Sequence, residues 1–275
     1  MSAAALAAIF GSAVIHAAWN ALLKRTSDVG AASIVISGGA AAVTALLGVV
    51  IGPWVVPPSG WPFVIGAGLV EGAYFVTLSR ALELLPLGAA YGISRGAGLL
   101  LVWPLSAALL AERTTPVELL GAGLVSLGLF ALVQRAGSRQ GLLAAGACAV
   151  TIGLYPVTYK AALEHGVAPF PLFALALFIA LPIQLALLGA RRRPRVLTAV
   201  AAAPWRLGLA ALLCAASFLL FLVALDRAGA ARITGLRNTS VAFAAAFGWA
   251  QGEPRARRTV ASSIAIAAGA LLLTM

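Results

Sequence analysis

Charged residues are scarce in this chain of 275 residues. Asp, Glu, Lys and Arg together make up 10% of it, whereas 62% is hydrophobic and the mean hydropathy is +1.02. A water-soluble domain devotes about a quarter of its residues to charge. The composition therefore excludes an ordinary soluble fold and indicates an integral membrane protein.

Residues that hold metals or act as nucleophiles are also few, with 2 Cys and 2 His. Cys148 and Cys214 lie in apolar stretches without CxxC spacing, so they predict neither a disulfide nor a metal site. The motif GISRG (92–96) matches the G-x-S-x-G pattern of hydrolases, but that pattern acts at a sharp turn between a strand and a helix. Here it lies inside an apolar run. We therefore expect no enzyme, no metal and no cofactor; a membrane-embedded hydrolase using Ser94 is the alternative from another class.

Apolar runs long enough to cross a bilayer recur along the whole chain. A membrane helix needs about 20 largely apolar residues to span about 30 Å of hydrocarbon, and backbone groups in lipid must be satisfied within the segment. The sequence predicts an all-α membrane protein with ten transmembrane helices, at residues 3–23, 30–52, 62–82, 86–110, 116–134, 141–163, 169–190, 204–226, 229–250 and 257–274. The first run lacks a positively charged leader and is expected to be a retained helix rather than a signal peptide.

The net charge of +11 would suggest nucleic acid in a soluble protein, but its placement indicates otherwise. Most Lys and Arg residues fall in the odd-numbered loops between the predicted helices. The positive-inside rule then places these loops in the cytoplasm and both termini outside. The expected partners are lipid headgroups and a small-molecule substrate rather than nucleic acid. We expect a multi-pass protein of a bacterial-type plasma (inner) membrane, for which a monomer is sufficient.

The two halves of the chain share a weak internal repeat. The stretch ALE (81–83) recurs as ALD (224–226). The same spacing sets three polar positions of one half opposite three of the other: Tyr91, Ser94 and Arg95 opposite Thr234, Arg237 and Asn238. A unit of five helices is odd in number, so the second copy must cross the membrane in the opposite sense. The sequence predicts two inverted five-helix repeats, 1–137 and 138–275, in one transmembrane unit.

Three segments resemble a known family: HAAWNALLK (16–24), RALELLPLGAAYGISR (80–95) and AERTTPVELLGAGLVSLG (111–128). They are similar to the drug/metabolite transporter superfamily, EamA type. The resemblance implies a ten-helix exporter of small metabolites, with amino acids as the first candidate. Nucleotide sugars, sugar phosphates, phosphonates and cationic drugs are the alternatives. It also implies alternating access around a central midplane cavity. Family members often keep their termini cytoplasmic, whereas the loop charges here predict the reverse.

Polar and aromatic residues recur at helical spacing inside the predicted spans. An ionisable side chain at mid-membrane costs at least about 2.5 to 3.5 kcal/mol on insertion scales, so it suggests a functional role. Residues at i, i+3 and i+4 share a helix face. These faces predict a substrate-binding cavity lined by His16, Trp19, Asn20, Glu71, Tyr74, Tyr91, Ser94, Arg95, Tyr155, Tyr159, Ser217, Arg237 and Asn238.

The predicted lining suits a zwitterion. Arg95 or Arg237 could hold a carboxylate and Glu71 an ammonium group, while aromatic faces add cation–π attraction. The same residues could instead join helices, with an Arg–Glu pair neutralising itself inside the bundle. Transport could be coupled to proton exchange through Glu71 or could be uncoupled facilitated diffusion, and the sequence is consistent with either.

Small residues, prolines and two further carboxylates have structural interpretations. Three glycines and the stretch SGGAAA (37–42) predict close helix packing. The glycines are Gly121, Gly128 and Gly269. Pro104, Pro156 and Pro182 predict kinks. Glu112 and Glu253 are expected to complement the N-termini of the helices that follow them.

Overall fold

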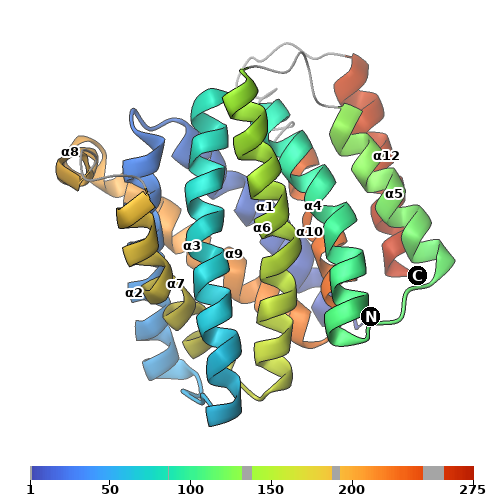
Figure 1. The fold of residues 1–275 in the computed structure, drawn as a ribbon, viewed down its shortest axis with the longest axis horizontal. Coiled ribbons are helices and arrows are strands. Elements are labelled where there is room, and N and C mark those ends of the chain that lie inside the picture. The colour runs from blue at the N-terminus through green and yellow to red at the C-terminus, as the bar shows by residue number, and fades with distance from the viewer. Residues whose placement is uncertain (1, 86, 132–137, 188–192, 244–256) are drawn as a thin grey trace.

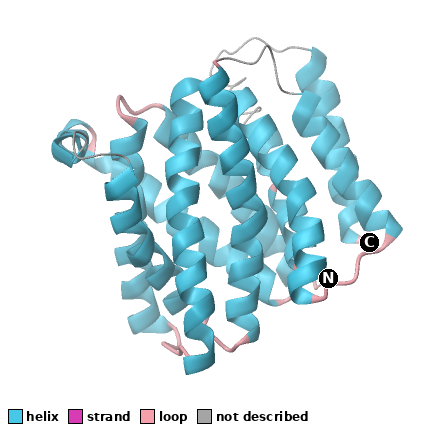
Figure 2. Ribbon diagram, in the orientation of Figure 1, coloured by secondary structure: helices cyan, strands magenta, loops and turns pink. Residues whose placement is uncertain are grey.

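The computed structural model describes residues 2–85, 87–131, 138–187, 193–243 and 257–275, and within these ranges the chain forms helices and no strands (Figures 1 and 2). The helices are α1 (Ala3–Lys24), α2 (Val29–Ile51), the 3₁₀ turn η1 (Pro58–Gly60), α3 (Trp61–Leu84), α4 (Leu87–Leu110), α5 (Pro116–Ala131), α6 (Arg139–Glu164), α7 (Pro169–Leu187), α8 (Arg193–Ala202), α9 (Pro204–Asp226), α10 (Ala230–Arg237) and α12 (Arg257–Thr274).

Seven helical segments of the described chain are long and apolar enough to cross a membrane. They comprise α1, α2, η1 with α3, α4, α6, α7 and α9, while α5 and part of α12 are shorter apolar helices. Their bounds agree within a few residues with the predicted spans. The chain is therefore a multi-pass membrane protein. The first predicted span is part of the bundle, because α1 packs along α9.

The predicted span 229–250 is not one continuous helix. α10 ends at Arg237, Asn238 and Thr239 form a turn, and helical structure resumes at residues 240–243; residues 244–250 lie outside the described part. Thr239 Oγ1 donates a hydrogen bond to the carbonyl of Leu236 at 2.7 Å. This bond accompanies the break but does not explain it, because Ser37 in α2 and Thr151 in α6 make the same kind of bond within unbroken helices.

The connection between α7 and α9 contains a helix that was not predicted from the sequence, because the segment is rich in arginine. The sequence RRRPR marks a loop by composition, yet α8 begins at Arg193 and runs to Ala202. Pro194 occupies the first turn, where a missing N–H costs nothing. The helix packs against α2 and α9, and Figure 1 shows it at the outer edge of the bundle.

Close helix packing relies on glycine, as predicted. A Cβ atom on Gly121 of α5 would lie 2.9 Å from the carbonyl oxygen of Gly269 in α12, and one on Gly269 would lie 2.6 Å from the oxygen of Gly121. Gly128 faces the carbonyl oxygen of Ser262 in the same way, at 2.8 Å. Only glycine allows two backbones to approach this closely. Figure 1 shows α5 and α12 side by side.

One predicted structural role falls on a different helix. The carboxylate of Glu112 accepts hydrogen bonds from the backbone N–H groups of Ala230, at 2.7 Å, and Ala231, at 3.5 Å, so it caps α10 and not α5. α5 is capped instead by Thr115 and Glu118, whose side chains each accept from the other's backbone N–H. This reciprocal arrangement is a capping box. Glu253 lies outside the described residues.

Candidate functional site

All of the predicted site residues lie in the interior of the bundle. None of the thirteen side chains exposes more than 3% of its surface. They come from α1, α3, α4, α6, α9, α10 and the turn that follows α10. Most of them belong to one of two polar groups. The first, the arginine cluster, comprises His16, Trp19, Arg95, Ser217, Arg237 and Asn238. The second, the acid pair, comprises Glu71 and Tyr159.

His16 is the centre of the arginine cluster. Its Nδ1 atom lies 3.2 Å from Nε1 of Trp19 and 3.0 Å from Nη2 of Arg237. Its Nε2 atom contacts Nη2 of Arg95. Ser217 Oγ is 3.4 Å from Nδ1. One imidazole from α1 is thus held between two guanidinium groups that come from α4 and α10.

Arg95 is bound to the turn after α10. Its Nη1 donates to Oδ1 of Asn238 at 3.2 Å, and Nδ2 of Asn238 donates to the carbonyl of Arg95 at 3.3 Å. The guanidinium also lies 4.9 Å from the ring centroid of Tyr91. Within the described chain, its Nε and the Tyr91 hydroxyl have no hydrogen-bond partner. Arg95 therefore keeps donor capacity that the protein does not use.

Arg237 is the last residue of α10 and lies against an aromatic surface. Its Nη1 donates to the Tyr155 hydroxyl at 3.2 Å, and its Nη2 donates to Ser217 Oγ at 3.3 Å. The guanidinium carbon stands 4.2 Å from the ring centroid of Phe218 and 4.3 Å from that of Phe221. Such cation–π contacts contribute about 2 kcal/mol when desolvated. They hold the charge in place without neutralising it.

The acid pair is separate from both arginines. Tyr159 donates its hydroxyl proton to Oε2 of Glu71 at 3.0 Å, while Oε1 of Glu71 has no partner in the described chain. Among the described residues, no salt bridge joins Glu71 to Arg95 or Arg237. The interpretation in which an Arg–Glu pair neutralises itself is therefore not the arrangement found here.

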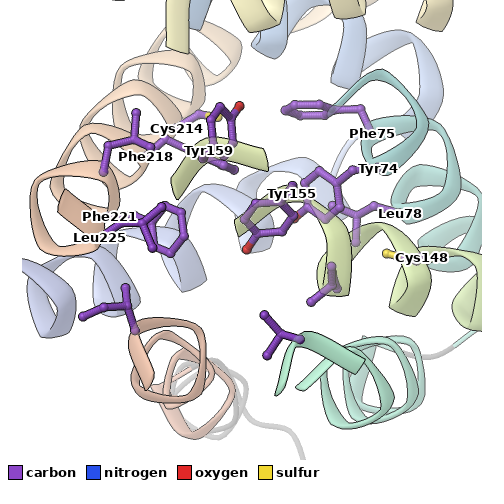
Figure 3. Close-up of a cluster of buried hydrophobic side chains, with 14 of the residues drawn as sticks. Tyr74, Phe75, Leu78, Cys148, Tyr155, Tyr159, Cys214, Phe218, Phe221 and Leu225 are labelled. Carbon is purple, nitrogen blue, oxygen red and sulfur yellow. The ribbon is translucent and has the colours of Figure 1, made fainter. Parts of the chain in front are cut away.

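Tyr155 connects the two polar groups. Figure 3 shows its ring between Phe221 of α9 and Tyr74 of α3, with ring centroids 5.9 and 5.5 Å apart. Its hydroxyl accepts from Arg237, and its ring lies 6.1 Å from that of Tyr159. Arg237, Tyr155, Tyr159 and Glu71 thus form a continuous series with cations at one end and a carboxylate at the other.

Other polar residues of these helices bond mainly to backbone. Ser94 donates to the carbonyl of Ala90 at 2.6 Å and Thr234 to that of Ala230 at 2.7 Å. Asn20 donates to the carbonyl of His16 at 2.8 Å, which leaves its Oδ1 without a partner in the described chain. Ser94 makes no hydrogen bond to an imidazole in the described structure, and no contact there indicates a nucleophile.

Three residues of this region were missed by sequence reasoning. Ser12 and Ser217 exchange hydroxyl-to-carbonyl hydrogen bonds at 2.8 and 3.1 Å, which join α1 to α9. Phe218 and Phe221 lie beneath Arg237. A helical face that includes Ser12 and His16 was visible in the sequence, whereas the two Phe residues were indistinguishable from ordinary apolar lining.

Comparison with known proteins identifies the family. The family described as the EamA-like transporter family matches residues 139–275, the second half of the chain. The chain belongs to the EamA-like transporter family. This family is part of the drug/metabolite transporter superfamily, and its members are transporters rather than enzymes.

A solved structure shares the fold of this EamA-like transporter. It is a protein crystal structure that covers 100% of this chain and 97% of its own length, with a TM-score of 0.75 and 18% sequence identity. At this identity the likeness establishes the fold alone. No curated protein matches the sequence. The family indicates a membrane transporter of small molecules.

Proposed function

We propose that this EamA-like transporter is a secondary transporter that exports amino acids by alternating access around the buried polar site. The observation that carries the proposal is the series from Arg237 through Tyr155 and Tyr159 to Glu71. It offers cationic donors at one end and a carboxylate at the other. A zwitterionic metabolite has the complementary arrangement of charge.

The cationic end suits an acid group of the substrate. Arg95 and Arg237 converge on His16, and each has an Nε atom without a partner in the described chain. Guanidinium groups bind planar carboxylates through paired N–H donors, which gives orientation as well as energy. A substrate carboxylate at this end would contact both arginines.

The acidic end suits an ammonium group. Oε1 of Glu71 is buried without a partner in the described structure, and unsatisfied buried acceptors cost about 1 to 3 kcal/mol each. A substrate ammonium would remove that cost. The surrounding rings of Tyr155 and Tyr159 would add cation–π attraction.

Pairings between helices support the two inverted repeats. α1 packs on α9 as its counterpart α6 packs on α3, while α2 packs on its own counterpart α7, and α5 on α12. Lys24, which ends α1, donates to the carbonyl of Leu82 in α3; Lys160 in α6 donates to that of Leu225 in α9 at 3.1 Å. In this arrangement, alternating access would be a rocking of one repeat against the other around the site.

The proposed orientation has the odd-numbered loops in the cytoplasm and both termini outside a bacterial-type inner membrane. Figure 1 shows both ends of the chain at the same end of the bundle. The positive-inside bias of the loops supports this direction. A tag after Met275 should be accessible to antibody on intact spheroplasts, and labelling only after permeabilisation would reverse the orientation.

Transport in proteoliposomes tests the proposed function. Purified protein should exchange internal for external radiolabelled amino acid above the level of protein-free liposomes. A panel of unlabelled amino acids, sugar phosphates, nucleotide sugars and organic cations added as competitors would identify the class. Inhibition by cations alone, with none by amino acids, would overturn the proposal. A pH gradient imposed in the same vesicles would separate proton exchange from uncoupled facilitation.

A further inference from the structure

The arginine cluster contains more hydrogen-bond donors than acceptors. Trp19, Arg95 and Arg237 present only N–H groups, which cannot accept. Trp19 and Arg237 face Nδ1 of His16, and Arg95 faces Nε2. Both nitrogens of one imidazole are therefore approached by groups that can only donate, and Ser217 Oγ, 3.4 Å from Nδ1, is the one further neighbour in the cluster that could accept.

No tautomer of His16 satisfies these neighbours. A neutral imidazole has one acceptor nitrogen and one N–H group. If Nε2 carries the hydrogen, it meets Nη2 of Arg95; if Nδ1 carries it, it meets the indole N–H of Trp19. In either case at least one N–H group of the cluster lacks an acceptor, in addition to Nε of Arg95 and Nε of Arg237.

The same cluster has an excess of positive charge. The buried carboxylates in the described chain are Glu71 and Glu118, and Glu118 pairs with Arg232. Arg95 and Arg237 together carry two positive charges, and Glu71 offsets at most one. Whichever protonation state Glu71 adopts, the described residues of the site retain a net positive charge of at least one. Asn238, Ser217 and Tyr155 contribute neutral groups only.

We propose that the cargo is a metabolite with net negative charge, whose acidic groups together carry at least two negative charges and bind at Arg95 and Arg237. The inference rests on the proposed function, since it concerns the cargo of the same site. A neutral amino acid would leave one positive charge uncompensated beside Glu71. A cargo with one ammonium group and two negative charges, such as an acidic amino acid, would balance the site and supply the missing acceptors. The phosphate of a phosphorylated amino acid would bring close to two negative charges besides the carboxylate.

Matched pairs of substrates test the proposed preference for a cargo with net negative charge, which we call the charge rule. Glutamate and glutamine, and phosphoserine and serine, differ mainly by charge at the acidic end. For each compound, counterflow should be measured in proteoliposomes, and ligand-induced thermal stabilisation should be measured on the detergent-purified protein. We expect the acidic member of at least one pair to be preferred by at least about tenfold, because a site that binds a polar group rejects the analogue lacking it. Comparison of the two pairs tells carboxylate from phosphate recognition.

Substitution of one arginine should change the preference in a predictable direction. Arg95→Gln and Arg237→Gln each remove one positive charge, and we expect each to abolish the preference for the acidic member. Arg206→Gln, which removes a charge that lies over the ring of Trp205, is the matched control and should leave the preference unchanged. Each variant is first compared with the parent protein for gel-filtration profile and melting temperature.

The outcomes separate the two proposals. Equal or better transport and stabilisation by glutamine and serine would overturn the charge rule while leaving amino-acid export intact. An acidic preference that persists in both arginine variants would also overturn it. If neither member of either pair is transported above protein-free liposomes or stabilises the protein, the charge rule fails. If no amino acid of the wider competition panel is transported either, the proposed function fails with it.

Discussion

Arg95 and Asn238 bind each other through two hydrogen bonds, from the guanidinium to Oδ1 at 3.2 Å and from Nδ2 to the Arg95 carbonyl at 3.3 Å. Arg95 lies in α4, and Asn238 in the turn that ends α10. The two positions are equivalent in the proposed repeats, and residues that contact their own equivalents lie on the axis relating the two halves. The contact thus lies where the halves meet.

The variant Asn238→Asp should separate stability from transport. The new carboxylate would accept from Arg95 in a charged pair, which offsets the loss of the hydrogen bond from Nδ2 to the Arg95 carbonyl, so we expect a melting temperature close to that of the parent protein. Transport of an acidic cargo should fall at least about tenfold, because the new carboxylate binds the Arg95 guanidinium and competes with the cargo for it. Hydrogen bonds between charged groups contribute more binding energy than neutral ones do.

Asn238→Leu provides the contrasting variant. It removes both hydrogen bonds and should destabilise the protein by about 1 to 3 kcal/mol. Melting temperature and counterflow are measured for both variants. If Asn238→Asp transports acidic cargo as well as the parent protein does, Arg95 is not a substrate contact.

Substitutions at Glu71 and Tyr159 also distinguish an effect on stability from an effect on transport. Glu71→Gln keeps an acceptor for the Tyr159 hydroxyl but loses the charge, so we expect a normal melting temperature and a KM for amino acid raised at least about tenfold. Tyr159→Phe leaves both oxygens of Glu71 without a donor and should cost about 1 to 3 kcal/mol of stability. An unchanged KM in Glu71→Gln would remove the carboxylate from the site.

Packing of α5 on α12 yields a prediction that does not involve transport chemistry. Gly269→Ala places a Cβ atom 2.6 Å from the carbonyl oxygen of Gly121, and Gly121→Ala places one 2.9 Å from that of Gly269. Each must push the helices apart, at about 1 to 3 kcal/mol. Gly123→Ala, on the same helix with nothing within 4 Å, is the control and should be neutral or slightly stabilising. Equal melting temperatures for all three variants would contradict this packing.

The membrane-spanning part of the fold could be predicted from sequence because lipid imposes a length and a continuous apolar character on each span. The burial of Arg95, Arg237 and Glu71 followed from their positions within those spans. The break at Asn238 did not, since the apolar run continues on both sides of it. α8 was missed for the opposite reason, because its arginines resemble a loop by composition.

The contacts between site residues could not be predicted without the tertiary structure. Helical spacing set His16, Trp19 and Asn20 on one face, but periodicity does not state which helix that face meets. The convergence of two arginines on His16 depends on the rotations of α4 and α10. The pairing of Glu71 with Tyr159 instead of an arginine depends likewise on the approach of α6 to α3.

The cap that Glu112 provides to α10 should affect the site from a distance. α10 has only 8 residues and carries Arg237 at its end, so its position depends on its N-terminus. Glu112→Ala removes the acceptor for the N–H groups of Ala230 and Ala231 and should cost about 0.5 to 2 kcal/mol. We expect a lower melting temperature together with weaker transport, because Arg237 loses its fixed position. Glu164→Ala is the control, since that carboxylate is 47% exposed and lies 3.8 Å from Lys160, and such surface pairs contribute about 0 to 1 kcal/mol. If Glu112→Ala melts and transports like Glu164→Ala, the cap does not position α10.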